Sequence, residues 1–276
     1  MPFSPEPAEP NVDRRMALTS IAGSVVALAS ASDGPALALE ARTTGVILMH
    51  GKWFNTVDMA PVADALQAAG FLVDTPEMPW SSRRLYDRSV VEVYDEIDAA
   101  AERLTRAGAH RIVAGGHSSG AGAAFRYASL GRSLAALVLI APAPVIESAR
   151  FQDRIMADLA RARRLAAEGA GDTLAPFLEF NSIGQSRAVT TTPNIYLSFN
   201  APDGPAAMTR AAPKVGSVPM LWIAASDDPG VAAFSQFVVP NLPATARLER
   251  IDVVADHLSA VAPAAEPVTK WLLALT

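Results

Sequence analysis

The sequence predicts an α/β fold: a mostly parallel sheet flanked by helices, with a cap inserted between two strands. Two observations support this prediction. Short apolar runs, typical of buried strands, alternate with segments of helical spacing, and short loops join them. This alternation is typical of parallel strands with helices on both faces. Residues 142–217 interrupt the rhythm and are too many for a loop in a compact core, so we expect them to form the cap.

Turn residues bound the predicted elements. The first strand, Gly45–Gly51, is a continuous apolar run ended by a glycine, as expected for a strand buried on both faces. Further strands are predicted over 71–73, 112–115, 134–141, 219–225 and 247–253. Helical spacing of apolar residues predicts helices over 57–69, 90–108, 119–130 and 260–275, the last interrupted early by Pro263 and Pro267. In the cap, a charged helix is predicted from about Glu147 to Glu168.

The composition narrows the class of protein. A chain of 276 residues, half of them hydrophobic, suits one large domain or a domain with an insertion. The net charge of −5, without a strongly basic stretch, argues against a nucleic-acid partner. There is no cysteine, which excludes thiol catalysis and disulfides, and the four histidines have no metal-ligand spacing. We therefore expect no metal and no cofactor.

The first 38 residues differ from the rest. A proline- and acid-rich start is followed by Arg14-Arg15 and a moderately apolar run, 19–31, which resembles a twin-arginine export signal. The run is too short and too rich in small residues to hold a membrane span. Acidic residues before the arginines, and Ala17 in place of a large apolar residue, depart from the pattern. We expect a periplasmic or secreted protein, or a cytoplasmic one if this segment is only a tail.

The most informative motif is Gly116-His117-Ser118-Ser119-Gly120, between a predicted strand and a predicted helix. It fits Gly-x-Ser-x-Gly, in which a sharp turn exposes the serine hydroxyl, so Ser118 is a candidate nucleophile. The glycines on either side are needed because a side chain there would collide with the neighbouring strand and helix. A glycine-rich turn that merely packs closely is the alternative.

A serine needs a base and an orienting carboxylate, and both follow later strands. His257 comes after the strand 247–253, and Asp227-Asp228-Pro229 after the strand 219–225. Residues just past the carboxyl ends of parallel strands share one edge of the sheet, so these side chains are expected to face one crevice with Ser118. Asp228 is the favoured acid, with Asp227 the nearest alternative and Glu147 a further one.

Backbone N–H groups must also meet the oxyanion of acyl transfer. We expect those of Ser119, which begins the helix, and Lys52, in the loop after His50-Gly51, and no chemical role for the Lys52 side chain. Possible pocket residues are His50, Trp53, His117 and Trp80. In the loop 76–84, Arg83 and Arg84 could contact an anionic substrate group or serve only as surface charge.

With these motifs the chain resembles the α/β-hydrolase family from about residue 45 to its end. The resemblance implies an α/β-hydrolase fold and the triad Ser118, Asp228 and His257, in the family's order. One departure is that the usual first two strands are shortened or missing. The resemblance implies a serine hydrolase acting on a small-molecule ester, thioester or amide. A non-catalytic binding or scaffold protein and an acyltransferase remain alternatives, and the sequence does not determine the oligomeric state.

Overall fold

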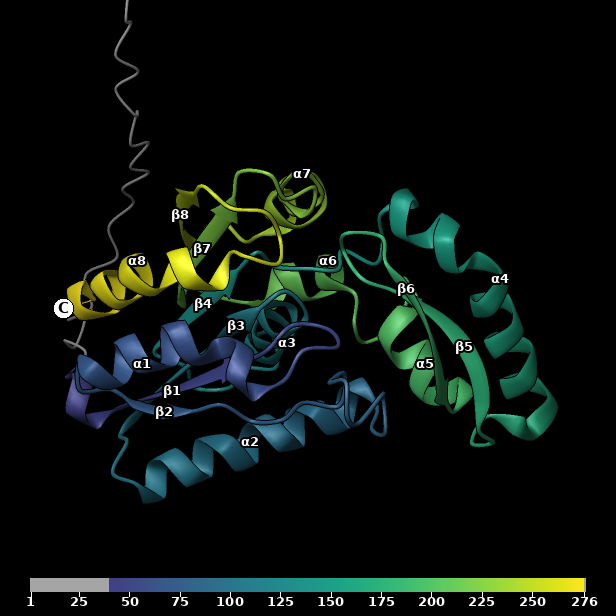
Figure 1. Ribbon diagram of the computed structural model, residues 1–276, viewed down its shortest axis with the longest axis horizontal. Coiled ribbons are helices and arrows are strands. Elements are labelled where there is room, and N and C mark those ends of the chain that lie inside the picture. The colour runs from purple at the N-terminus through teal and green to yellow at the C-terminus, as the bar shows by residue number, and fades with distance from the viewer. Residues whose placement is uncertain (1–39, 276) are drawn as a thin grey trace, which may run out of the picture. The chain divides into compact units, whose positions relative to one another are not determined.

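The computed structural model describes residues 40–275, and the predicted export signal lies outside them. The described residues form a six-stranded sheet in the order β2-β1-β3-β4-β7-β8, in which every neighbouring pair is parallel (Figure 1). The strands are β1 (Thr44–Met49), β2 (Leu72–Asp74), β3 (Arg111–His117), β4 (Ala136–Ile140), β7 (Pro219–Ala225) and β8 (Arg247–Val253). The predicted parallel α/β architecture is confirmed.

Helices cover both faces of this sheet (Figure 1). One face packs against α1 (Ala60–Ala68) and α8 (Val261–Ala274), the other against α2 (Val90–Arg106) and α3 (Ser119–Ala128). Strand β1 shows why its apolar run is continuous. Val46 and Leu48 lie in the core on the α1 and α8 face of the sheet. Ile47 and Met49 lie in the core on the α2 and α3 face, because successive side chains of a strand point to opposite faces.

Local sequence signals account for the helix boundaries. Helix α2 begins with a capping box, in which Ser89 and Glu92 satisfy each other's backbone N–H groups. Helix α8 runs on through Pro267, so the predicted interruption is wrong there. Pro263 lies in the first turn, where the N–H groups have no intrahelical acceptor, and Pro267 removes a single intrahelical bond. Between β7 and β8 lies the short helix α7 (Gly230–Ala233).

The chain between β4 and β7 forms a separate layer of elements beside the sheet (Figure 1). It contains α4 (Ala149–Leu165), the antiparallel hairpin β5 (Ala175–Phe180) and β6 (Ser186–Thr191), and α5 (Pro193–Asn200), whereas the short helix α6 (Met208–Ala211) packs against α3. Its helix α4 starts and ends within three residues of the predicted charged helix, but no sequence signal predicted the hairpin. The stacked rings of Phe177 and Tyr196, 4.4 Å apart, join the hairpin to α5.

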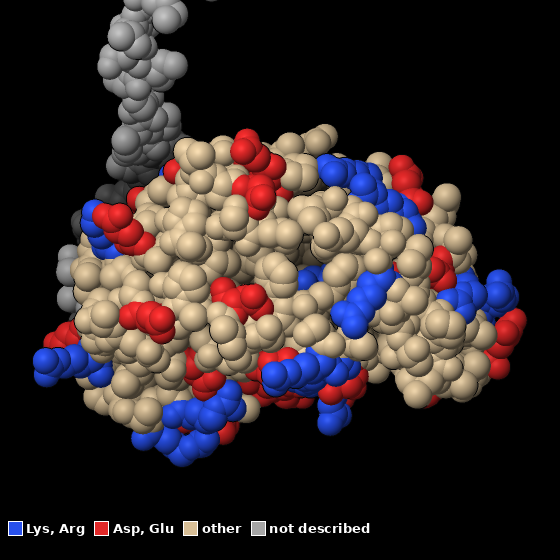
Figure 2. Space-filling view, viewed as in Figure 1, with Lys and Arg blue, Asp and Glu red and all other residues tan. Residues whose placement is uncertain are grey.

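Acidic and basic side chains are interspersed over the face shown in Figure 2. None of the helices within residues 40–275 combines the length and the hydropathy needed to cross a membrane. The same residues contain no group of three or more His, Asp or Glu side chains placed to hold a metal ion.

Candidate active site

Ser118 sits on a strained turn between β3 and α3. Its backbone has φ 53° and ψ −113°, a left-handed conformation that costs about 1–3 kcal/mol and persists only where the surroundings impose it. Here the Ser118 N–H donates to Ile140 O at 2.9 Å, while Ser118 O accepts from Gly122 N at 3.0 Å. These bonds tie the turn to β4 and to the first turn of α3.

The two motif glycines are required by a single neighbouring group. A Cβ atom on Gly116 or on Gly120 would lie 2.1 Å from the carbonyl oxygen of Met49, at the end of β1. No side-chain rotation can relieve a clash with backbone. The turn therefore depends on close approach to strand β1, whereas the sequence had suggested clashes with both a strand and a helix.

The structure brings Ser118, His257 and Asp228 into one hydrogen-bonded chain. Asp228 Oδ2 lies 2.8 Å from His257 Nδ1, and His257 Nε2 lies 2.9 Å from Ser118 Oγ. A carboxylate only accepts, so Nδ1 carries the proton and Nε2 is left to accept from the serine hydroxyl. All three residues are at least 95% buried, which shields these contacts from water.

The geometry separates the alternative acids. Asp228 is buried, and its Oδ1 accepts the backbone N–H of Gly230 at 2.7 Å, which fixes the carboxylate toward His257. Asp227 is exposed, and Glu147 accepts from the Thr209 hydroxyl and backbone instead. Of the three, the structure brings only Asp228 to the imidazole.

His117 supports the loop that carries His257. Its Nε2 lies 2.7 Å from the backbone carbonyl of His257, so Nε2 must carry the donated proton. Its Nδ1 is buried with no partner among the described residues. Burial, reinforced by the nearby His257, lowers the pKa of His117 to about 3, so the ring stays neutral. It holds the loop in place and does not line the cavity described below.

His50 holds a loop in a similar way. Its Nδ1 donates to Gly51 O at 2.8 Å, and its Nε2 accepts the Met78 N–H at 3.0 Å. Burial lowers its pKa, which keeps the ring neutral for this pair of bonds. The backbone of Trp53 is held by a 2.8 Å hydrogen bond to Trp80 O. Of the four possible pocket residues, only Trp80 lines the cavity.

The two backbone N–H groups that the sequence predicts as oxyanion donors lie at the start of α3 and in the turn after β1. Ser119 is the first residue of α3, so its N–H has no intrahelical acceptor and lies at the positive end of the helix dipole. Lys52 lies in the turn after β1, and its N–H has no hydrogen bond to the described residues. Both residues line one cavity between the sheet and the inserted elements.

The Lys52 side chain has a structural partner that the sequence did not predict. Its Nζ lies 2.5 Å from Glu179 Oε2 and donates to Phe180 O at 2.8 Å, both on β5. The two charged side chains are only 7% and 1% exposed. This buried pair ties the loop after β1 to the insertion.

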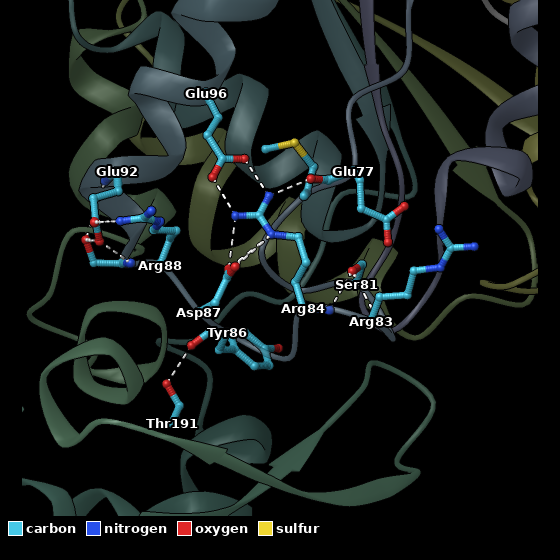
Figure 3. Close-up of polar contacts among 12 residues, drawn as sticks. Glu77, Ser81, Arg83, Arg84, Tyr86, Asp87, Arg88, Glu92, Glu96 and Thr191 are labelled. Carbon is cyan, nitrogen blue, oxygen red and sulfur yellow. Dashed lines mark hydrogen bonds and ion pairs between the residues drawn. The ribbon is translucent and has the colours of Figure 1, made fainter. Parts of the chain in front are cut away.

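The arginines of loop 76–84 have different surroundings. Arg84 is held by both oxygens of Glu96, by Asp87 and by the backbone of Glu77, as Figure 3 shows. Its guanidinium therefore serves the loop, and the structure gives it no free face for a substrate anion. Arg83 is exposed.

Tyr86 and Arg126 are among the residues of the cavity wall that sequence reasoning missed. For Arg126 a signal was available. It follows Ser119 by seven residues on the predicted helix, which puts both on one helical face. Tyr86 lies in an irregular loop, where no periodicity indicates a direction.

Comparison with known proteins agrees with this architecture. Residues 46–268 match the family model described as "Alpha/beta hydrolase family". No curated protein matches the chain.

Similar solved structures include the Paleococcus ferrophilus monoacylglycerol lipase, at TM-score 0.61 and 17% identity, covering 87% of this chain and 97% of that one. A structure of the metagenome-derived lipolytic enzymes LipS and LipT has TM-score 0.58 and 17% identity, covering 85% and 93%. Est1E from Butyrivibrio proteoclasticus has TM-score 0.56 and 17% identity, covering 86% and 89%. At these identities the likeness is one of fold.

Proposed function

The chain belongs to the alpha/beta hydrolase family, and from that premise we propose that it is a serine hydrolase. Its substrate would be a small carboxylic ester, or a related thioester or amide, cleaved through an acyl-enzyme on Ser118. One observation carries the proposal: the continuous hydrogen-bonded chain from Asp228 through His257 to the Ser118 hydroxyl.

The steps follow from that chain. Ser118 Oγ attacks the carbonyl carbon while His257 Nε2 takes its proton, and Asp228 stabilises the imidazolium that forms. The N–H groups of Lys52 and Ser119 meet the oxyanion; losing one such donor typically costs about 2.7–4 kcal/mol in the barrier. The imidazolium then protonates the leaving group. Water, deprotonated by His257, releases the acid and restores the serine.

Two features support a hydrolase over a passive binding protein. The backbone of Ser118 is strained, which costs stability, and strained residues cluster at functional sites. A binding protein also needs no base aimed at a hydroxyl. Distant likeness to a monoacylglycerol lipase and to lipolytic enzymes agrees with ester chemistry.

The test is turnover of p-nitrophenyl esters of graded acyl length. We expect the wild type to hydrolyse short acyl esters and to lose activity as the chain outgrows the enclosed cavity. Ser118→Ala should retain the fold and lose at least about 10³-fold in kcat. Ser226→Ala, at an exposed serine, is the matched control. Undiminished turnover in folded Ser118→Ala would contradict the proposal.

A further inference from the structure

The cavity beside the proposed oxyanion donors contains a buried cation that has no counter-ion among the described residues. Arg126 is 6% exposed and lines this cavity. Its guanidinium has five N–H donors, yet among the described residues it makes a single hydrogen bond, from Nη1 to Ala206 O at 3.2 Å. Its Nε is buried without an acceptor, and none of the ion pairs within residues 40–275 involves Arg126. Burial of an unpaired charge is costly, so a partner other than the described residues is indicated.

The guanidinium extends back along α3 toward Ser119. Arg126 follows Ser119 by two helical turns, and long side chains on a helix lean toward its N-terminus. Gly122 lies between them, and a Cβ there would be 3.0 Å from Arg126 Nη1. The charge therefore lies beside Gly122, about 5 Å along the axis from the start of α3.

The other cation of the cavity is already neutralised. Lys52 pairs with Glu179, whose second oxygen accepts from Asn200 Nδ2 at 2.6 Å. The pair contributes no net charge to the cavity. The uncompensated positive charge is that of Arg126.

Two further side-chain hydroxyls belong to the cavity wall. Tyr86 Oη and Ser119 Oγ are buried and unpaired among the described residues. Burial raises the pKa of Tyr86, so its hydroxyl remains a neutral donor. Leu85 and Tyr86 both adopt positive φ, 49° and 65°, and Thr191 donates to Tyr86 O at 2.6 Å (Figure 3). This fixes a strained loop that turns the phenol into the cavity wall.

We propose that the cavity binds a substrate acyl group that ends in a carboxylate, with Arg126 as its counter-ion and the Tyr86 hydroxyl as a second donor. The planar guanidinium matches the two oxygens of a carboxylate. Trp80 and Phe199 supply apolar wall for the connecting methylenes. The short offset from Ser119 to the guanidinium suits a succinyl or glutaryl spacer. This inference rests on the proposed function, because the ester carbonyl must lie at Ser118.

The kinetic test compares the 4-nitrophenyl monoester of glutaric acid with its methyl-capped diester, which lacks the charge. The wild type should prefer the monoester by at least about tenfold in kcat/KM, and Arg126→Met should lose about 30-fold on it, mainly through KM. The methyl-capped ester should change far less. Arg126→Lys should keep part of the preference. An equal loss on both esters, or no preference in the wild type, would overturn the proposal.

Stability separates a binding role from a structural one. Replacing a buried unpaired charge by an apolar side chain is neutral or stabilising, so Arg126→Met should unfold at an unchanged or higher temperature. A marked fall in Tm would show that Arg126 holds the fold, and would overturn the binding role.

Binding without turnover keeps the two proposals distinguishable. Calorimetry on Ser118→Ala should detect monomethyl glutarate and show at least about tenfold weaker binding of dimethyl glutarate. Failure of the proposed hydrolase function would appear as a wild type inactive on both nitrophenyl esters, while this binding persisted. Equal affinity for both glutarates, or none for either, would overturn the carboxylate site.

Discussion

The Nε2–H of His117 donates to the backbone carbonyl of His257 at 2.7 Å, so one motif residue holds the loop that carries the proposed base. The two imidazole rings lie 5.1 Å apart. A charge on His117 would oppose the imidazolium that forms on His257. The low pKa of His117 thus serves both the fold and the proposed chemistry.

Stability should fall in acid because of His117. Its pKa is about 3 in the folded protein and near 6.5 when unfolded, so the unfolded chain binds more protons between these values. The free energy of unfolding should therefore rise with pH across this window and level off above it. At pH 5, protonation of His117 in the unfolded chain lowers the free energy of unfolding by about 2 kcal/mol relative to neutral pH. Denaturant unfolding of the wild type and His117→Gln from pH 4.5 to 8 measures it; equal slopes in both proteins would contradict the account.

The Lys52–Glu179 pair should show strong coupling. Removing one partner of a buried ion pair leaves an uncompensated charge and costs about 3–5 kcal/mol. We expect Lys52→Met and Glu179→Leu each to destabilise the protein, and the double variant to be more stable than the sum of the single changes implies. A double-mutant cycle of unfolding free energies checks this. Additive effects would mean that the two side chains do not interact.

Gly120→Ala should damage the fold more than Gly122→Ala. The new Cβ of the first would lie 2.1 Å from Met49 O, which cannot move without shifting β1. The second would meet the movable end of Arg126, and alanine favours a helix by about 1 kcal/mol. We expect a loss of at least about 3 kcal/mol, or no folded protein, for Gly120→Ala only. Thermal unfolding of both variants compares them, and similar Tm values would refute the close-approach argument.

The two adjacent aspartates should differ in their effect on turnover. Asp228→Asn removes the carboxylate that fixes the His257 tautomer and should lower kcat by about 10⁴-fold. Asp227→Asn, at an exposed neighbour, should change it by less than about twofold, as is usual away from a site. Steady-state kinetics on one ester decides between them. The reverse ranking would assign the role to Asp227.

Much of this arrangement could be predicted because strand ends and turns have local sequence signals. The run 45–51 predicted β1, and the motif around Ser118 predicted the strand–turn–helix order. The hairpin β5–β6 could not be predicted, because its short strands are specified by packing against α4 and α5. Nor could the pairing of Lys52 with Glu179, which are 127 positions apart. Contacts of this kind arise only when distant segments meet in the folded chain.

The most direct test of the central claim is labelling with a fluorophosphonate, followed by peptide mapping. Ser118 should be the modified residue in the wild type, because His257 makes its hydroxyl nucleophilic. His257→Gln, folded, should label at least about 10³-fold more slowly. Modification at another serine, or an unlabelled wild type with native structure, would contradict the account.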